Sequence, residues 1–115
     1  MDNSNTITYQ DFEKVEIRSG TITKAEAFPR ARNPAYKVWV DFGDTIGIKQ
    51  TSAQITVNYT PESLIGLQVL GAINLGTKNI AGFESQFLLL GFDDPNGAII
   101  LATTTNKVPN GKKLH

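Results

Sequence analysis

Residues 47–91 carry the strongest signals for the fold of this chain. They comprise Gly47-Ile-Lys-Gln-Thr-Ser-Ala-Gln-Ile-Thr56, Tyr59-Thr-Pro-Glu-Ser-Leu-Ile-Gly66, Val69-Leu-Gly-Ala-Ile-Asn-Leu75 and Ile80-Ala-Gly-Phe-Glu-Ser-Gln-Phe-Leu-Leu-Leu-Gly91. This order predicts a short strand, a one-turn helix, a buried strand, a polar loop around Lys78 and Ser85, and a second buried strand. Because polar side chains gather where the apolar strands end, the stretch indicates the binding face of a small β-barrel.

The flanking segments supply the remaining strands. Tyr36-Lys-Val-Trp-Val-Asp-Phe-Gly-Asp44 alternates cleanly and predicts a strand that pairs with residues 46–51. Residues 15–28 predict a long strand, and a change of parity around Gly20 predicts a bulge or sharp coil there. Residues 98–102 predict a short last strand, and Thr8 and Thr60 each predict the N-cap of a helical turn. Five or six short strands with this helical turn predict an all-β OB-fold, a five-stranded Greek-key barrel.

Residues 67–74 and 86–92 are apolar on both parities. Strands of this kind are expected to be buried on both faces, inside a barrel wall or beneath a partner subunit. They carry more apolar surface than one small barrel readily covers, which predicts a stable homodimer. The length of 115 residues predicts a single domain over residues 1–115.

Composition narrows the class of protein. The net charge is zero, with acidic and basic residues in alternating blocks, so the chain lacks the overall basic charge of a strong non-specific nucleic-acid binder. A local basic patch and ordinary solvated charge both stay open. There is no cysteine and no apolar run near the ~20 residues of a membrane span. Residues 1–6 are polar and acidic, unlike a signal peptide. We therefore expect a cytoplasmic protein without membrane insertion.

The sequence offers little for catalysis. Its one histidine is the terminal His115, and it contains neither a P-loop nor a Gly-x-Gly-x-x-Gly motif. The carboxylates are scattered, and Asp93 and Asp94 lie in a predicted turn where aspartate is common. We expect no enzymatic activity, no cofactor and no metal site.

Two polar clusters are candidate binding determinants. Lys49, Gln50, Ser52 and Gln54 lie at one strand end, and Asn74, Lys78, Asn79 and Ser85 flank the next loop. Both clusters offer donors suited to phosphates or to backbone amides, and each could equally be a solvated strand end. Secondary basic candidates are Arg18, Arg30 and Arg32.

Trp39 is expected on the opposite strand face from Tyr36, Val38 and Val40. It could stack on a base, dock another protein or be covered by its own chain, and the sequence leaves these alternatives open.

Several motifs in a fixed order carry a family resemblance. They are Ile17-Arg-Ser-Gly-Thr-Ile22, Pro34-Ala-Tyr-Lys-Val38, Val40-Asp-Phe-Gly43, the stretches 46–56 and 59–66 quoted above, Ile80-Ala-Gly-Phe-Glu-Ser85 and Val108-Pro-Asn-Gly111. From about Phe12 to Leu114 the chain resembles the tRNA-binding-domain family, in particular its small bacterial members described as protein-export chaperones. The resemblance implies an OB-fold with short N- and C-terminal extensions that build a symmetric homodimer.

The resemblance also implies partners and positions. Such proteins bind unfolded preproteins and the translocase motor SecA, and the wider family binds tRNA by shape. Lys49, Ser52, Asn74, Lys78 and Ser85 match the family's binding-face motifs. Two hypotheses follow: a dimeric chaperone whose grooves hold extended segments of unfolded chains, or a tRNA-binding module whose lysines contact phosphates.

Overall fold

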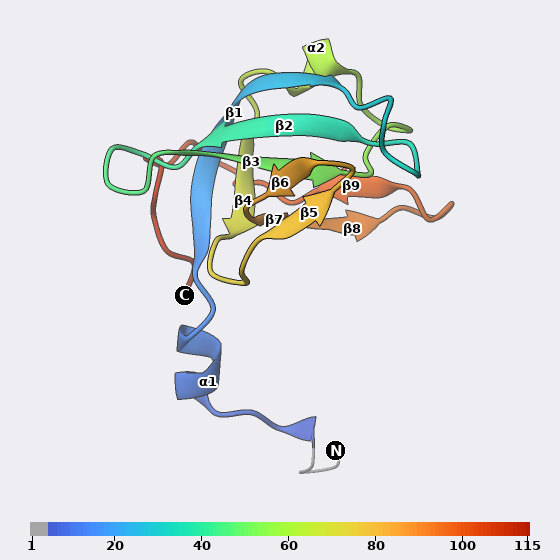
Figure 1. Ribbon diagram of the computed structural model, residues 1–115. Coiled ribbons are helices and arrows are strands. Elements are labelled where there is room, and N and C mark those ends of the chain that lie inside the picture. The colour runs from blue at the N-terminus through green and yellow to red at the C-terminus, as the bar shows by residue number, and fades with distance from the viewer. Residues whose placement is uncertain (1–4) are drawn as a thin grey trace.

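The computed structural model describes residues 5–115, which form two short helices and nine strands. The elements are α1 (Tyr9–Glu13), β1 (Ile17–Ala27), β2 (Tyr36–Asp41), β3 (Ile48–Ala53), α2 (Pro61–Leu64), β4 (Gln68–Ala72), β5 (Lys78–Ile80), β6 (Phe83–Ser85), β7 (Leu88–Leu89), β8 (Gly91–Asp93) and β9 (Ile99–Leu101). Five strands form one antiparallel sheet in the order β3-β2-β1-β4-β7, which curls into a nearly closed barrel (Figure 1). The predicted all-β OB-fold is confirmed.

The long strand β1 joins both halves of the barrel. Its first half pairs with β4 from Ile17 to Thr21, and its second half pairs with β2. The register with β2 shifts between Ile22 and Lys24. The predicted bulge is therefore present, but it lies three residues beyond Gly20. Gly20 serves packing instead, since a Cβ there would lie 2.5 Å from Val40 Cγ1.

The core fills the barrel interior with aliphatic side chains around one aromatic pair. Phe42 and Phe87 meet edge to face with their ring centroids 5.0 Å apart. The predicted alternation of β2 is confirmed, because Val38 and Val40 are fully buried while Trp39 lies on the outer face. Other buried members of the core are Ile22, Ile55, Leu64, Val69 and Leu101.

Both helical turns begin as the sequence predicts. The Thr8 and Thr60 hydroxyls accept a hydrogen bond from the backbone N–H three residues later. In return, the side chains of Asp11 and Ser63 accept from the backbone N–H of Thr8 and Thr60. These capping boxes satisfy N–H groups that a helix start otherwise leaves open. α2 plugs one end of the barrel with Leu64, whereas α1 stands clear of the barrel (Figure 1).

The region after β4 differs from the prediction in two ways. The polar loop around Lys78 and Ser85 is in fact the hairpin β5–β6, whose turn residues Ala81 and Gly82 both have positive φ. The segment 86–92 is not one strand buried on both faces. It divides into β7, at the edge of the barrel, and β8, which pairs only with β9, so Leu88 and Phe92 are exposed.

The C-terminal segment runs along β1 on the edge that β4 leaves free. Ser19 exchanges backbone bonds with Gly111 and Lys112, and the Leu114 N–H donates to the Ile17 carbonyl. Within residues 5–115 no helix is long and apolar enough to span a bilayer. The expectation that residues 1–6 are not a signal peptide lies largely outside the part that the structure describes.

Candidate functional site

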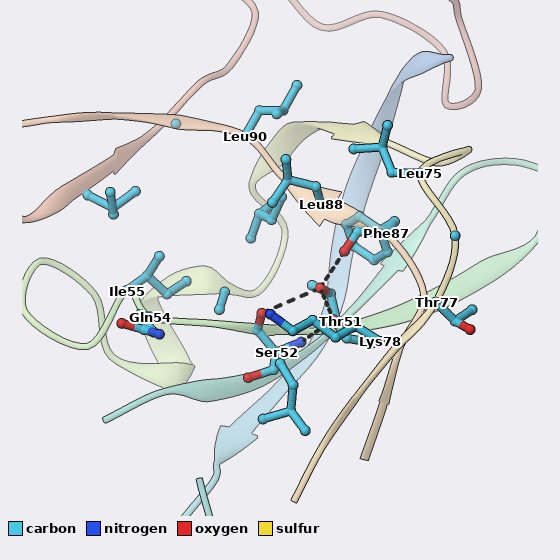
Figure 2. Close-up of a pocket in the computed structure, with 17 residues that line it drawn as sticks. Thr51, Ser52, Gln54, Ile55, Leu75, Thr77, Lys78, Phe87, Leu88 and Leu90 are labelled. Atoms are coloured by element: carbon cyan, nitrogen blue, oxygen red, sulfur yellow. Dashed lines mark hydrogen bonds between the residues drawn. The ribbon is translucent and has the colours of Figure 1, made fainter. Parts of the chain in front are cut away.

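A groove of about 610 Å³ opens where the barrel is least closed, between the end of β3 and strand β7 (Figure 2). The loop between β4 and β5 and the first strand of the β5–β6 hairpin form its other wall. Its lining is mostly apolar, with hydroxyl groups from β3 and the amide of Gln54 just after that strand. The side chains used below are those of Thr51, Ser52, Gln54, Leu75, Lys78, Ser85, Leu88 and Leu90.

Side chains rather than a continuous strand ladder close the barrel beside this groove. The Thr51 hydroxyl donates to the Phe87 carbonyl at 2.6 Å and therefore accepts from the Ser85 hydroxyl at 2.8 Å (Figure 2). The Ser52 N–H donates to Ser85 Oγ at 3.1 Å. Every hydrogen of this buried chain of hydroxyls thus has an acceptor, and the chain links β3 to β6 and to Phe87, the residue before β7, without a strand ladder.

A second link between the same segments joins Gln50, which precedes Thr51, to Gln86, which follows Ser85. The Gln86 N–H donates to the Gln50 carbonyl at 2.8 Å, and the Gln50 N–H donates to the Gln86 side-chain oxygen at 3.0 Å. The Gln50 side-chain amide donates to the Glu84 carbonyl at 2.9 Å. The outer edge of β3 is therefore hydrogen-bonded to the segment 84–87 from Gln50 to Ser52, and the groove begins beyond Ser52.

The structure brings four of the six primary candidates to the groove, namely Ser52, Gln54, Lys78 and Ser85. Gln54 and Lys78 are exposed, whereas Ser85 is buried and bonded within the closure. Among the described lining residues Lys78 is the only one that carries a charge. The groove therefore combines an apolar floor with one cation at its rim.

The other two primary candidates lie outside the groove. Asn74 fastens the N-terminal segment to the barrel, because its amide accepts from the Glu16 N–H at 2.8 Å and donates to the Lys14 carbonyl at 2.7 Å. Lys49 lies opposite Val40 in the β2–β3 ladder and does not line the groove. Lys49 and Asn74 therefore do not line the groove that Lys78 lines.

The secondary basic candidates divide in the same way. Arg18 bonds to Glu16 at 2.6 Å and to the Gly111 carbonyl at 2.9 Å, which makes it a tie between the terminal segments. Lys113 completes the tie at 2.9 Å from Glu16. The hydrogen bonds from Lys113 and then from Arg18 lower the pKa of the Glu16 carboxyl. Arg30 and Arg32 are exposed in the loop between β1 and β2.

Sequence reasoning missed the apolar part of the site. Leu75, Leu88 and Leu90 line the groove, whereas the pattern of residues 86–92 indicated burial inside a barrel wall or beneath a partner subunit. Their position at the barrel opening depends on β7 being short and on β8 leaving the barrel. No group of three or more His, Asp or Glu side chains within residues 5–115 could hold a metal ion. The described lining of the groove contains no histidine, aspartate or glutamate that could act as a general acid or base.

The fold and the groove define a small β-barrel module with an open groove on its surface. Residues 17–113 match the family model described as "Putative tRNA binding domain", and the chain belongs to this family. Within the family it is similar to two crystal structures of the chaperone CsaA, from Bacillus anthracis str. Ames and Picrophilus torridus. Both are 42% identical to it, with TM-scores of 0.89 and 0.88, and the matches cover 96% of this chain and 99% and 100% of those chains.

The family also links the chain to larger proteins. It is 33% identical over 101 residues to the methionine–tRNA ligase of Salinibacter ruber, a match that covers 88% of this chain. The chain spans only 14% of the length of that ligase, so it corresponds to one domain of it.

Proposed function

We propose that this chain is a non-enzymatic, CsaA-like chaperone that acts in the cytoplasm and holds extended apolar segments of unfolded polypeptides in its groove. One observation carries the proposal: a groove of about 610 Å³ is lined by leucines that remain exposed beside Ser52 and Gln54. Its volume is in the range of specific ligand sites. The proposal includes the two partners that the family resemblance implies, which are unfolded preproteins as clients and SecA.

The groove chemistry suits an extended chain. Leu75 and Leu88 offer apolar surface for client side chains. Ser52 and Gln54 offer donors and acceptors at the end of β3 for the client backbone, which must replace its hydrogen bonds to water when it binds. Since only Lys78 is charged here, the affinity for an uncharged client is expected to depend weakly on salt.

Leu88→Asp is expected to weaken binding of an unfolded polypeptide at least about tenfold, because a carboxylate replaces an apolar contact worth roughly 1.5–3 kcal/mol. Leu88 is 52% exposed, so the change leaves the fold intact. Ile65→Asp is the matched control, since Ile65 is 50% exposed and lies outside the groove. The measurement is fluorescence anisotropy of a labelled, permanently unfolded client, together with suppression of its aggregation. Equal effects of the two variants would contradict the proposal.

tRNA is the second candidate ligand, favoured by the family match and by Lys78 at the groove rim. The same titration with total tRNA separates the two functions. Phosphate contacts release counterions, so tRNA affinity should fall steeply between low and physiological salt, whereas client affinity should change little. A steep salt dependence for tRNA with no binding of the client would favour the tRNA-binding module over the chaperone.

We further infer that two copies associate through their terminal extensions. α1 stands clear of the barrel with Ile7 and Tyr9 exposed, and the β8–β9 hairpin exposes the cross-strand pair Phe92 and Ile100. Light scattering at micromolar concentration is expected to give twice the 12.5 kDa mass of one chain. The mass of a single chain would count against the dimer.

A further inference from the structure

The outer face of the barrel carries a row of aromatic side chains that the groove does not use. Trp39 lies on this face of β2 and meets Phe83 of the hairpin β5–β6 at a centroid distance of 5.9 Å. Phe83 also meets Phe28 at 5.5 Å. Phe28 is buried and Phe83 is half-buried, so this pair fastens the hairpin to the barrel. Trp39 stands at the end of the row and is half-buried.

Two lysines accompany the row in different settings. The Lys37 ammonium lies between two rings, 4.9 Å from the Phe28 centroid and 5.1 Å from that of Phe83. The Lys24 ammonium lies 4.6 Å over the Trp39 ring, and its side chain is 62% exposed. Its ion pair with Glu26 is long, at 3.8 Å. Lys24 is therefore a loosely held cover that can leave the Trp39 ring.

This arrangement matches what an unpaired nucleotide needs. Aromatic rings flanked by cations bind single strands because each base stacks on a ring while a lysine contacts the phosphate. In OB-folds the face of the second and third strands, with its adjoining loops, is where oligonucleotides bind. Trp39 occupies this face next to Gln50 of β3, and the loop that carries Arg30 and Arg32 begins just after β1. A base that stacks on Trp39 would replace the solvent-exposed cation–π contact of Lys24. That contact is weaker than base stacking, so the exchange is favourable.

We propose that Trp39 is a stacking site for an unpaired base of single-stranded RNA, and that Lys24 moves from the ring to the neighbouring phosphate. The site is separate from the groove, since neither residue lines it. The proposal goes beyond the binding of folded tRNA, because it predicts recognition of unpaired bases and not of an RNA surface alone.

Intrinsic fluorescence tests the site directly, since Trp39 is the only tryptophan in the chain. Titration of the full chain with a 12-nucleotide oligouridylate at low salt is expected to quench this fluorescence with saturation. A blunt RNA duplex of equal length should not quench it, because its bases are already stacked. The absence of quenching by the single strand, or equal quenching by the duplex, would overturn the proposal. So would quenching by an unfolded polypeptide alone, which would assign Trp39 to a protein partner.

Variants separate stacking from charge by anisotropy of a labelled oligouridylate. Trp39→Leu is expected to weaken binding about tenfold, and Trp39→Phe, which keeps the contact with Phe83, about threefold. Lys24→Met keeps the apolar stem and should reduce the salt slope by about one, whereas the exposed control Lys107→Met should leave affinity for this oligomer unchanged. Wild-type affinity in both Trp39 variants would overturn the stacking site.

Total tRNA, measured in parallel, distinguishes this proposal from the proposed function. If the wild-type chain binds tRNA but not the oligomer, the Trp39 site fails while RNA binding stands.

Discussion

Phe42→Ala is expected to lower the free energy of unfolding by about 3–5 kcal/mol. Phe42 is 1% exposed and packs edge to face on Phe87, so truncation removes its buried ring and leaves a cavity. The backbones of β1 and β4 also approach this ring at Gly20 and Gly71, where a Cβ would lie within about 3 Å of it. The surrounding barrel wall consists of paired strands, which cannot collapse inward to fill the space without breaking their ladders.

Chemical denaturation at a fixed protein concentration measures this effect, because association of copies would make stability depend on concentration. Val57→Ala is the control. It truncates an apolar side chain at a site that is 78% exposed and outside both the groove and the proposed association surface, and we expect a change within about 0.5 kcal/mol. Similar losses in both variants would contradict the assignment of Phe42 to the centre of the core.

Gly71→Ala is expected to destabilise the barrel by about 1–3 kcal/mol although it adds only one methyl group. The new Cβ would lie 2.8 Å from Phe42 Cζ and 2.9 Å from Phe87 Cδ2. Real side chains do not approach this closely, and both rings are fully enclosed, so either the rings or strand β4 must shift.

A double variant tests this reason for the loss. Phe42→Leu replaces the ring that Gly71 faces with a smaller aliphatic side chain, so the added methyl group can occupy part of the vacated space. The loss in Gly71→Ala with Phe42→Leu should therefore be smaller than the sum of the two single losses by about 0.5 kcal/mol or more. Thermal and urea unfolding of the four proteins in this cycle give the coupling energy. Additive losses would show that Gly71 is not limited by Phe42.

The way the barrel closes explains where its groove lies. β3 and β7 stand at the two ends of the sheet order, and the hydroxyls of Thr51 and Ser85 span the gap between them. A hydrogen-bonded strand ladder would have brought these edges together along their full length. Closure that extends only from Gln50 to Ser52 leaves the barrel open beyond Ser52, and the leucines of the segment after β6 line the opening.

Prediction from sequence succeeded where the signal is local. The two helix caps depend on residues three positions apart, and the alternation of β2 depends on its own side chains, so both appear in the chain without knowledge of its neighbours. The hairpin β5–β6 was missed because its strands are short and polar. What holds it is Phe83, which packs on Phe28 and Trp39 from distant segments.

The candidate site shows the same division. Ser52, Gln54, Lys78 and Ser85 could be picked out because polar residues interrupt apolar runs near strand ends. Asn74 has the same pattern, and only the folded chain shows that its amide holds the N-terminal segment. A polar side chain that binds a ligand and one that satisfies a nearby backbone look alike in a sequence.

Reading the chain alone is enough to find the long first strand, the β2–β3 hairpin, the helical turns, the inward face of β2 and the all-β OB-fold. These properties follow from spacing along the chain, which the backbone geometry of strands and helices converts directly into faces and ends. The folded chain is needed to see that Thr51 and Ser85 close the barrel, that Leu75 and Leu88 line its opening, and that Lys24 covers Trp39. Each of these contacts joins residues distant in the chain, and their partners depend on how the strands meet in space.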